Sequence, residues 1–253
     1  MPKIVLITGA TSGIGKACAH LFAQYNYHII ITGRRNSLLQ SLKEELKNLY
    51  HTEVYTLNFD VQNKEEVNLN LESLPPEWRT IDVLINNAGL SLGLTPIQEG
   101  ITNDWDTMLD TNVKGLLYVT KVVANWMIAN RKGHIINVGS VAGREVYANG
   151  NVYCASKHAV DALNKAMRID FLPHAIKVTT IHPGAVETEF SVVRFGGDEQ
   201  KAKKVYEGYE SLRPEDIAET ILFAVNTPPH VNINEMVIMP LAQASATYWH
   251  KNL

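Results

Sequence analysis

The sequence predicts an α/β fold: a doubly wound parallel sheet of about seven strands, with helices on both faces. Short runs rich in β-branched residues recur along the chain and are apolar on both faces, as buried parallel strands should be. Segments with helical periodicity separate most of these runs. A chain of 253 residues, 45% of them hydrophobic, can form one sizeable core, so we expect a single domain over residues 1–253.

The predicted elements alternate from one end of the chain to the other. The expected strands cover residues 4–8, 28–32, 54–59, 83–85, 134–138, 178–181 and 236–239. The expected helices cover residues 13–24, 37–49, 64–71, 103–130, 152–171 and 214–225. The polar segment 187–213 shows no such periodicity and contains Gly196 and Gly197. Long irregular segments in compact domains are usually functional, so we expect a substrate lid here.

Composition argues against several classes of function. The net charge of -3 and the pI near 6.3 indicate no basic surface for nucleic acid or an anionic membrane. No apolar stretch approaches the length of a membrane span, and no signal peptide is expected before the first apolar run. Cys18 and Cys154 do not make a disulfide framework and suit a reducing compartment. We therefore expect a cytoplasmic protein that acts on a small molecule, without a metal, nucleic acid or membrane partner.

Small and polar residues follow the predicted strands directly. In parallel sheets of this kind, ligands bind at the carboxyl ends of the strands. The residues at these ends are Thr8-Gly9, Gly33-Arg34-Arg35, Asp60, Asn86-Asn87, Gly139-Ser140 and His182-Pro183-Gly184. Residues that only pack the core would have no reason to cluster at one end of every strand, so we expect a binding crevice there.

A glycine-rich turn between the first strand and the first helix predicts a phosphate site. Its Gly-x-x-x-Gly-x-Gly pattern permits a tight turn and the close approach of a pyrophosphate to the backbone. N–H groups at the start of the helix favour the negative charge. A purely structural turn is the alternative interpretation. The residues expected to bind a cofactor here are Gly9, Thr11, Ser12, Gly13, Ile14 and Gly15.

Arg34 and Arg35, at the end of the second strand, determine which dinucleotide is predicted. NAD-binding proteins typically place Asp or Glu here for the ribose 2′-hydroxyl, whereas NADP-binding proteins place Arg. A guanidinium fork makes charge-assisted bonds with a 2′-phosphate. Solvated arginines would explain the charge but not the missing acid, so we predict NADP(H). Asp60, after the third strand, would either accept from the adenine amino group or bond to loop N–H groups.

Tyr153 and Lys157 are candidate catalytic residues. They lie four residues apart on a predicted helix and therefore share one face. Free tyrosine has a pKa of about 10, and a nearby ammonium lowers that pKa, as a general acid/base near neutral pH requires. Packing and solvation would also explain such a pair. Ser140 is placed to hold a carbonyl or hydroxyl oxygen, and Asn112 would either hold a water near Lys157 or brace a helix.

Together these motifs resemble the short-chain dehydrogenase/reductase family over essentially the whole chain. The matching segments are 8–15, 86–89, Asn112, Ser140, Tyr153-x-x-x-Lys157 and Pro183-Gly184. The resemblance implies a single-domain Rossmann fold and hydride transfer at a nicotinamide, with Tyr153 as general acid/base. It implies that Ser140 orients the substrate oxygen, that Lys157 lowers the tyrosine pKa and binds the ribose, and that Asn112 maintains a proton relay. The further cofactor contacts that it implies are Val61, Asn87, Pro183, Gly184, Val186 and Thr188.

Segments in both halves of the chain resemble a narrower group, the NADP-dependent 3-hydroxy acid dehydrogenases. The segments are 74–78, 86–93, 188–191 with 193–195, and 230–234. This group, also called serine or allo-threonine dehydrogenases, oxidises small 3-hydroxy acids or reduces the corresponding 3-oxo acids and semialdehydes. The resemblance implies the same activity here, in a cytosolic homotetramer. Some NADP-specific members carry a basic residue where Ser12 stands, so the cofactor preference depends on Arg34 and Arg35.

A carboxylate substrate requires a positive or donor-rich pocket, and two arginines are candidates. Arg194 lies in the lid segment, and Arg144 follows Ser140 closely. A solvated position on a surface loop is the alternative for each, and we predict that Arg194 matters more. Because fold and motifs fix the reaction but not the substrate, a secondary alcohol, a sugar or a 3-oxoacyl thioester is an alternative substrate. A non-catalytic dinucleotide-binding regulator is a remoter alternative, since every catalytic motif is present.

Overall fold

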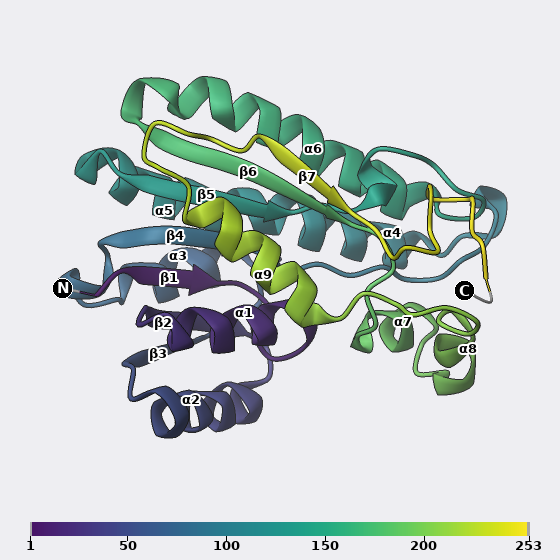
Figure 1. Cartoon of the computed structure of the whole chain (residues 1–253), viewed down its shortest axis with the longest axis horizontal. Helices are drawn as coiled ribbons and strands as arrows, with labels where there is room; N and C mark the ends of the chain where they lie inside the picture. Colours follow the sequence, from purple (N-terminus) through teal and green to yellow (C-terminus); the bar gives the residue numbers. More distant parts are fainter. Residues whose placement is uncertain (1, 252–253) are drawn as a thin grey trace.

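A computed structural model describes residues 2–251 (Figure 1). Its strands form one parallel sheet in the order β3-β2-β1-β4-β5-β6-β7, which confirms the predicted fold class. The strands are β1 (Ile4–Ile7), β2 (His28–Gly33), β3 (Val54–Asn58), β4 (Ile81–Asn86), β5 (Gly133–Val138), β6 (Ile176–Pro183) and β7 (Glu235–Ile238). The strand order reverses between β1 and β4, which opens the crevice where ligands bind in such sheets. The ends of the predicted domain, residues 1 and 252–253, lie outside the described residues.

Helices cover both faces of the sheet, as the sequence predicts (Figure 1). One face is covered by α1 (Gly13–Gln24), α2 (Asn36–Tyr50) and α9 (Pro214–Val225). The other face is covered by α3 (Lys64–Glu72), α5 (Leu116–Asn130) and α6 (Asn151–Phe171). The buried side chains beneath these two groups of helices form two separate hydrophobic cores.

Strand β1 shows why the strands are apolar on both faces. All four of its residues are buried. Val5 and Ile7 belong to the core beneath α1 and α9, whereas Ile4 and Leu6 belong to the core on the opposite face. Full burial of each such side chain contributes about 1.5–3 kcal/mol. Because both of its faces are covered, β1 carries only apolar side chains, and the polar Thr8 follows at its end.

The predicted helix over 103–130 is interrupted in the structure. The segment consists of α4 (Thr102–Leu109), a π-helical turn (Asp110–Gly115) and α5. Within the turn, the Asn112 side chain bonds to the backbone N–H and carbonyl of Leu90, both at 2.8 Å. An extra residue in one turn does not disturb the apolar periodicity enough to be seen in the sequence. Such turns occur frequently at functional sites.

The lid segment 187–213 is partly helical, although the sequence predicts an irregular loop. It contains α7 (Glu189–Arg194) and α8 (Glu199–Lys204). The side chains of Thr188 and Asp198 cap their first turns by accepting backbone N–H groups. Helices of six residues are too short to produce a periodic pattern, so the sequence gives no sign of them.

Short helical turns link several of these elements. They are η1 (Pro76–Trp78), η2 (Ile97–Glu99), η4 (Val141–Gly143) and η5 (Leu172–His174). Between residues 2 and 251, no helix combines the length and the hydropathy needed to cross a membrane.

Candidate active site

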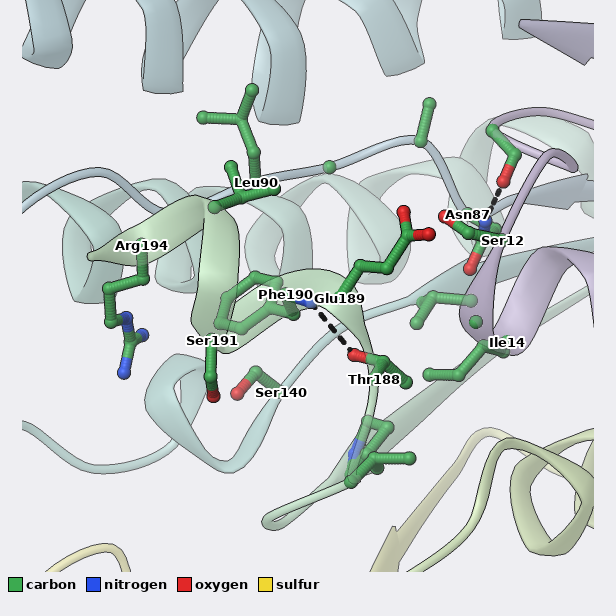
Figure 2. Close-up of a pocket in the computed structure, with 18 of the residues that line it drawn as sticks. Ser12, Ile14, Asn87, Leu90, Ser140, Thr188, Glu189, Phe190, Ser191 and Arg194 are labelled. Carbon is green, nitrogen blue, oxygen red and sulfur yellow. Dashed lines mark hydrogen bonds between the residues drawn. The ribbon is translucent and has the colours of Figure 1, made fainter. Parts of the chain in front are cut away.

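A cavity of about 670 Å³ lies at the carboxyl ends of the strands, where the sequence places the binding crevice. Figure 2 shows part of its lining, with Ser12 and Ile14 at the glycine turn and Arg194 on helix α7. Most of the predicted site residues line this cavity: Gly9, Thr11, Ser12, Gly13, Ile14, Arg34, Arg35, Asp60, Val61, Asn87, Ser140, Tyr153, Lys157, Pro183, Gly184, Val186, Thr188 and Arg194. Gly15, Asn112 and Arg144 are not part of its lining.

The glycine turn has the backbone that close approach of a phosphate requires. Gly9 and Gly13 have φ angles of 65° and 51°, in the left-handed region that favours glycine. A Cβ on Gly15 would lie only 2.4 Å from the Gly9 carbonyl oxygen, so this position supports the turn from behind. Ser12 precedes helix α1 but makes no side-chain capping bond, and the first turn of α1 has no acidic residue. Its N–H groups can therefore bind an anionic group.

Arg34 and Arg35 lie beside this turn. Arg35 donates to the hydroxyls of Thr11 at 2.8 Å and Ser12 at 2.9 Å, and it pairs with Glu189 at 3.0 Å. The side chains of both arginines are about half exposed to solvent. Two guanidinium groups beside a phosphate-binding turn fit a nucleotide that carries an additional phosphate.

Asp60 makes the loop contact that the sequence offered as one alternative. Its Oδ1 accepts the Gln62 N–H at 3.0 Å, which fixes the turn after β3. Its Oδ2 lies 3.4 Å from Arg34. Because the carboxylate also borders the cavity, contact with a bound adenine is still available to it.

The two asparagines after β4 have different tasks. Asn86 is buried and donates to Thr120 and to Asn137, both at 2.9 Å, so it braces the centre of the sheet. Asn87 donates to the carbonyl of Thr8 at 2.9 Å and to that of Gly9 at 3.1 Å. It therefore holds the glycine turn in shape while it borders the cavity.

Asn112 is buried, but it does not present a free amide toward Lys157. Besides its two bonds to Leu90, its amide donates to the Ser156 hydroxyl at 3.0 Å. A Cβ on Gly89 would lie 3.2 Å from Asn112 Oδ1 and 3.5 Å from Lys157 Nζ, so both groups border the Gly89 backbone. The side chain thus positions the Gly89–Leu90 backbone beside the lysine, a task that the sequence did not indicate.

Ser140, Tyr153 and Lys157 come together in the cavity. Burial raises the pKa of Tyr153, whereas the Arg194 charge and a hydrogen bond with Ser140 act to lower it. Lys157 donates to the Val138 carbonyl at 2.9 Å, and burial lowers the pKa of its ammonium group to about 8. The Arg194 charge thus acts on the phenol as well, and the lowering of the tyrosine pKa by Lys157 stays a prediction.

Arg194 lies over the catalytic candidates. Its guanidinium carbon is 5.1 Å from the centre of the Tyr153 ring and 5.0 Å from that of Phe190. It donates to the hydroxyls of Ser91 at 3.1 Å and Tyr147 at 2.9 Å. No Asp or Glu in the described chain pairs with it. A half-buried cation without a carboxylate partner can bind an anion.

Arg144 is directed elsewhere, although the sequence makes it the second candidate for a substrate carboxylate. It lies outside the cavity and pairs with Glu235 at 2.6 Å and with Asp161 at 3.8 Å. These acids already satisfy its charge. The alternation of strands and helices places the residue near Ser140 but does not tell toward which acids its long side chain turns.

Several cavity residues were not found from the sequence. Those on or near the lid are Tyr147, Phe190, Ser191 and Tyr206, and those near the C-terminus are Gln243, Ala246 and Trp249. Gln243 accepts the Ala185 N–H at 2.9 Å, and Trp249 packs on Tyr209 with ring centres 4.9 Å apart. The C-terminal segment carries no motif, so no pattern of residues indicates that it borders the cavity.

This crevice, with its glycine turn and its serine, tyrosine and lysine, is typical of a dinucleotide-binding oxidoreductase. The family model of the short chain dehydrogenases matches residues 3–196, and the chain belongs to that family. This confirms the resemblance that the motifs indicate.

Individual relatives point to a narrower group. The NADP-dependent 3-hydroxy acid dehydrogenase of Salmonella typhi is 48% identical, over 96% of this chain and 97% of its own. Sulfoacetaldehyde reductase 2 of Chromohalobacter salexigens is 41% identical, over 98% of each chain. A structure of the closed form of serine dehydrogenase complexed with NADP+ is 46% identical. It superposes with a TM-score of 0.93 and covers 96% of this chain and 97% of that chain.

Proposed function

We propose that this protein is an NADP-dependent oxidoreductase that oxidises small 3-hydroxy acids or reduces the corresponding 3-oxo acids and semialdehydes. The observation that carries this proposal is Arg194, a half-buried guanidinium that faces the same cavity as Ser140 and Tyr153. The names of the Salmonella relative and of the serine dehydrogenase structure support the same assignment.

The residues around the cavity fit NADP(H). The uncapped N–H groups of helix α1 would hold the pyrophosphate, and Arg34 and Arg35 would hold the 2′-phosphate. Lys157 would bind the nicotinamide ribose, and Thr188 the carboxamide. Pro183, Gly184 and Val186 would border the nicotinamide. When bound, the nicotinamide accepts a hydride in the oxidation and supplies one in the reduction.

Tyr153 is the proposed proton carrier. When the substrate is oxidised, its carbon loses a hydride, its hydroxyl loses a proton and a carbonyl forms. Tyr153 takes that proton and returns one when the reaction runs in the other direction. Ser140 holds the reacting oxygen beside the phenol. Burial opposes loss of the phenolic proton, so the cation of Arg194 and the bond to Ser140 assist this step.

Arg194 is the proposed anchor for the substrate carboxylate. Its Nε hydrogen and one Nη2 hydrogen are used by Ser91 and Tyr147. A guanidinium carries five N–H groups, so the other hydrogens are available to a second partner. Because the Arg194 guanidinium lies over the Tyr153 ring, a hydroxy acid whose carboxylate binds Arg194 would place its own hydroxyl near the phenol of Tyr153.

Tyr153→Phe separates an enzyme from a non-catalytic dinucleotide-binding protein. We expect kcat to fall about 100-fold or more, since general acid/base groups typically contribute that much. NADPH binding, followed by its fluorescence, should stay within the range of the wild type. If the protein had no catalytic function, the wild type itself would show no turnover.

The substrate class is tested by NADP reduction with serine, allo-threonine, 3-hydroxyisobutyrate, 3-hydroxypropionate and simple secondary alcohols, repeated with NAD. We expect turnover of the acids and a preference for NADP. Activity only on uncharged alcohols would refute the substrate assignment. The guanidinium of Arg194 also suits a sulfonate, and one relative is a sulfoacetaldehyde reductase, so sulfoacetaldehyde with NADPH belongs in the same panel.

We also propose a cytoplasmic homotetramer. Free cysteines at positions 18 and 154 are compatible with a reducing compartment. Large apolar side chains are exposed on helices and on the edge strand, among them Ile169, Leu172, Phe223 and Val237, which are 74%, 76%, 61% and 51% exposed. Such side chains are frequent in subunit interfaces. Light scattering on the purified protein should give four times the mass of one chain, and a monomer would contradict the assembly.

A further inference from the structure

His182 lies directly behind the proposed catalytic serine. It is a buried residue of β6, and its Nδ1 is 3.1 Å from the Ser140 carbonyl oxygen. Because a carbonyl oxygen only accepts, Nδ1 must carry the hydrogen and donate it. The same carbonyl accepts the Gly143 N–H at 2.9 Å. Both bonds together fix the Ser140 peptide plane from which the hydroxyl extends.

The fit between His182 and the serine loop is close. A Cβ on Gly139 would lie 2.8 Å from His182 Nδ1. The imidazole therefore fits beside the residue before Ser140 only because that residue is glycine. The imidazole therefore packs against the serine loop as well as bonding to it. A change in its size or position will be transmitted to Ser140.

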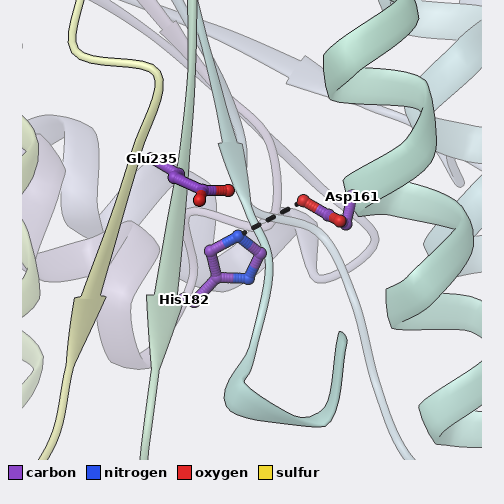
Figure 3. A group of neighbouring side chains, drawn as sticks. All are labelled: Asp161, His182 and Glu235. Atoms are coloured by element: carbon purple, nitrogen blue, oxygen red, sulfur yellow. Dashed lines mark ion pairs between the residues drawn. The ribbon is translucent and has the colours of Figure 1, made fainter. Parts of the chain in front are cut away.

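The other ring nitrogen faces the helix that carries the tyrosine. His182 Nε2 is 3.6 Å from Asp161 Oδ1, the contact drawn in Figure 3. Within residues 2–251 neither atom has a hydrogen-bond partner, and both are buried. Asp161 lies one turn beyond Lys157 on α6, and Lys157 lies one turn beyond Tyr153. His182 thus stands between the loop of Ser140 and the helix of Tyr153.

The surroundings of this cluster favour a positioning role over metal binding. His182, Asp161 and Glu235 offer three potential ligand atoms within 4.8 Å of one another (Figure 3). However, Arg144 pairs with Glu235 at 2.6 Å, and Lys165 pairs with Asp161 at 2.6 Å. These two cations already compensate the two carboxylates, and a metal ion would have to displace at least one of them.

We propose that His182 is a positioning residue, which fixes Ser140 relative to Tyr153 by donating from Nδ1 to the serine carbonyl, while its ring lies against the helix that carries Tyr153. The inference rests on the proposed function only in that Ser140 holds the reacting oxygen. A misplacement of about 1 Å in such a group can reduce turnover by about 100-fold. Loss of the imidazole should therefore reduce kcat without a matching effect on cofactor binding.

The experiment compares three substitutions that separate the two ring nitrogens. His182→Leu removes both polar contacts. His182→Asn places an amide N–H where Nδ1 lies, and His182→Gln reaches toward Nε2 and leaves the Ser140 side without a donor. His134→Leu is the matched control. His134 is also buried in the sheet and bonded to Thr179 at 2.8 Å, but it lies at the start of β5, away from Ser140.

We expect kcat of His182→Leu to fall about 10- to 100-fold, with KM and the NADPH dissociation constant changed less than threefold. His182→Asn should recover most of that loss, and His182→Gln little of it. His134→Leu should lower thermal stability and leave kcat unchanged. Each variant is assayed on the best substrate of the wild type, so a wrong substrate assignment would appear in the wild type and not in this series.

Three results would overturn the inference. One is a kcat of His182→Leu equal to that of the wild type. A second is recovery by Gln but not by Asn, which would locate the effect at Asp161. A third is activity that chelation with EDTA abolishes and Zn²⁺ restores in the wild type, because the cluster would then bind a metal.

Discussion

Substitution of Arg194 by Met tests the origin of substrate selectivity. Met keeps much of the apolar stem, but it removes the guanidinium group that lies over Tyr153 and Phe190, with its charge and every N–H group. We expect kcat/KM for a hydroxy acid to fall far more than kcat/KM for an uncharged secondary alcohol. The ratio of the two losses is the quantity predicted.

The magnitude follows from the surroundings of the guanidinium. A hydrogen bond to a charged group contributes about 1.5–3 kcal/mol, and a carboxylate can take up to two from one guanidinium. Because Arg194 is only half-buried, solvent reduces this gain, and we take about 3 kcal/mol in total. That energy corresponds to about 150-fold in kcat/KM. Both substrates lose some additional rate, since the cation also assists deprotonation of Tyr153.

The assay measures initial rates of NADP reduction for serine or 3-hydroxyisobutyrate and for 2-propanol. Arg194→Lys keeps the charge without the fork and should lie between the wild type and the Met variant. Arg213→Met is the control, because Arg213 is an exposed arginine at the end of the same lid segment. Equal losses for the acid and the alcohol would refute the anchor, because Arg194 would then serve only the phenol or the lid.

Three further predictions concern the cofactor site and stability. Arg34→Ala and Arg35→Ala together should weaken NADPH binding about 10- to 100-fold and leave NADH binding unchanged in a fluorescence titration; an equal loss for both would contradict the phosphate contact. Gly15→Ala should abolish NADPH binding, since its Cβ would lie 2.4 Å from the Gly9 carbonyl; retained affinity, measured by calorimetry, would contradict this. Burial lowers the pKa of Lys157 from 10.5 to about 8, so the unfolded chain binds this proton more tightly and the lysine destabilises the fold below pH 8. That penalty, up to about 3 kcal/mol, fades as the pH rises from 8 toward 10.5. In urea unfolding, Lys157→Met should exceed the wild type in stability at pH 7 and lose this advantage by about pH 10; a constant difference would contradict the shift.

The fold and the site residues at the strand ends could be predicted, because the sequence patterns that indicate them are local. Glycines at 9 and 13 have positive φ angles that the turn requires, and Tyr153 and Lys157 share one face through helical spacing alone. Parallel strands bring their carboxyl ends to one edge without further information, so Ser140 could be placed beside them.

The side chains that the lid and the C-terminal segment bring to the site could not be predicted, because their positions depend on contacts between distant segments. The sequence favours Arg194 over Arg144, but it does not reveal that acids at 161 and 235 pair with Arg144 and direct its side chain away from the cavity. Trp249 and Gln243 reach the cavity through the fold of the C-terminal segment, for which no sequence pattern exists. The bonds from Asn112 to Leu90 likewise depend on a π-helical turn that apolar periodicity does not reveal.

The position of Arg194 over the Tyr153 ring links two equilibria that would otherwise be independent. A substrate carboxylate bound to Arg194 neutralises the positive charge that favours the Tyr153 phenolate. Binding of a carboxylate substrate and loss of the Tyr153 proton therefore oppose each other. An anionic substrate therefore keeps the phenol protonated to a higher pH than a neutral one does. The oxidation of hydroxy acids should have its optimum at a higher pH than the oxidation of uncharged alcohols, whereas a protonated phenol favours the reduction of semialdehydes near neutral pH.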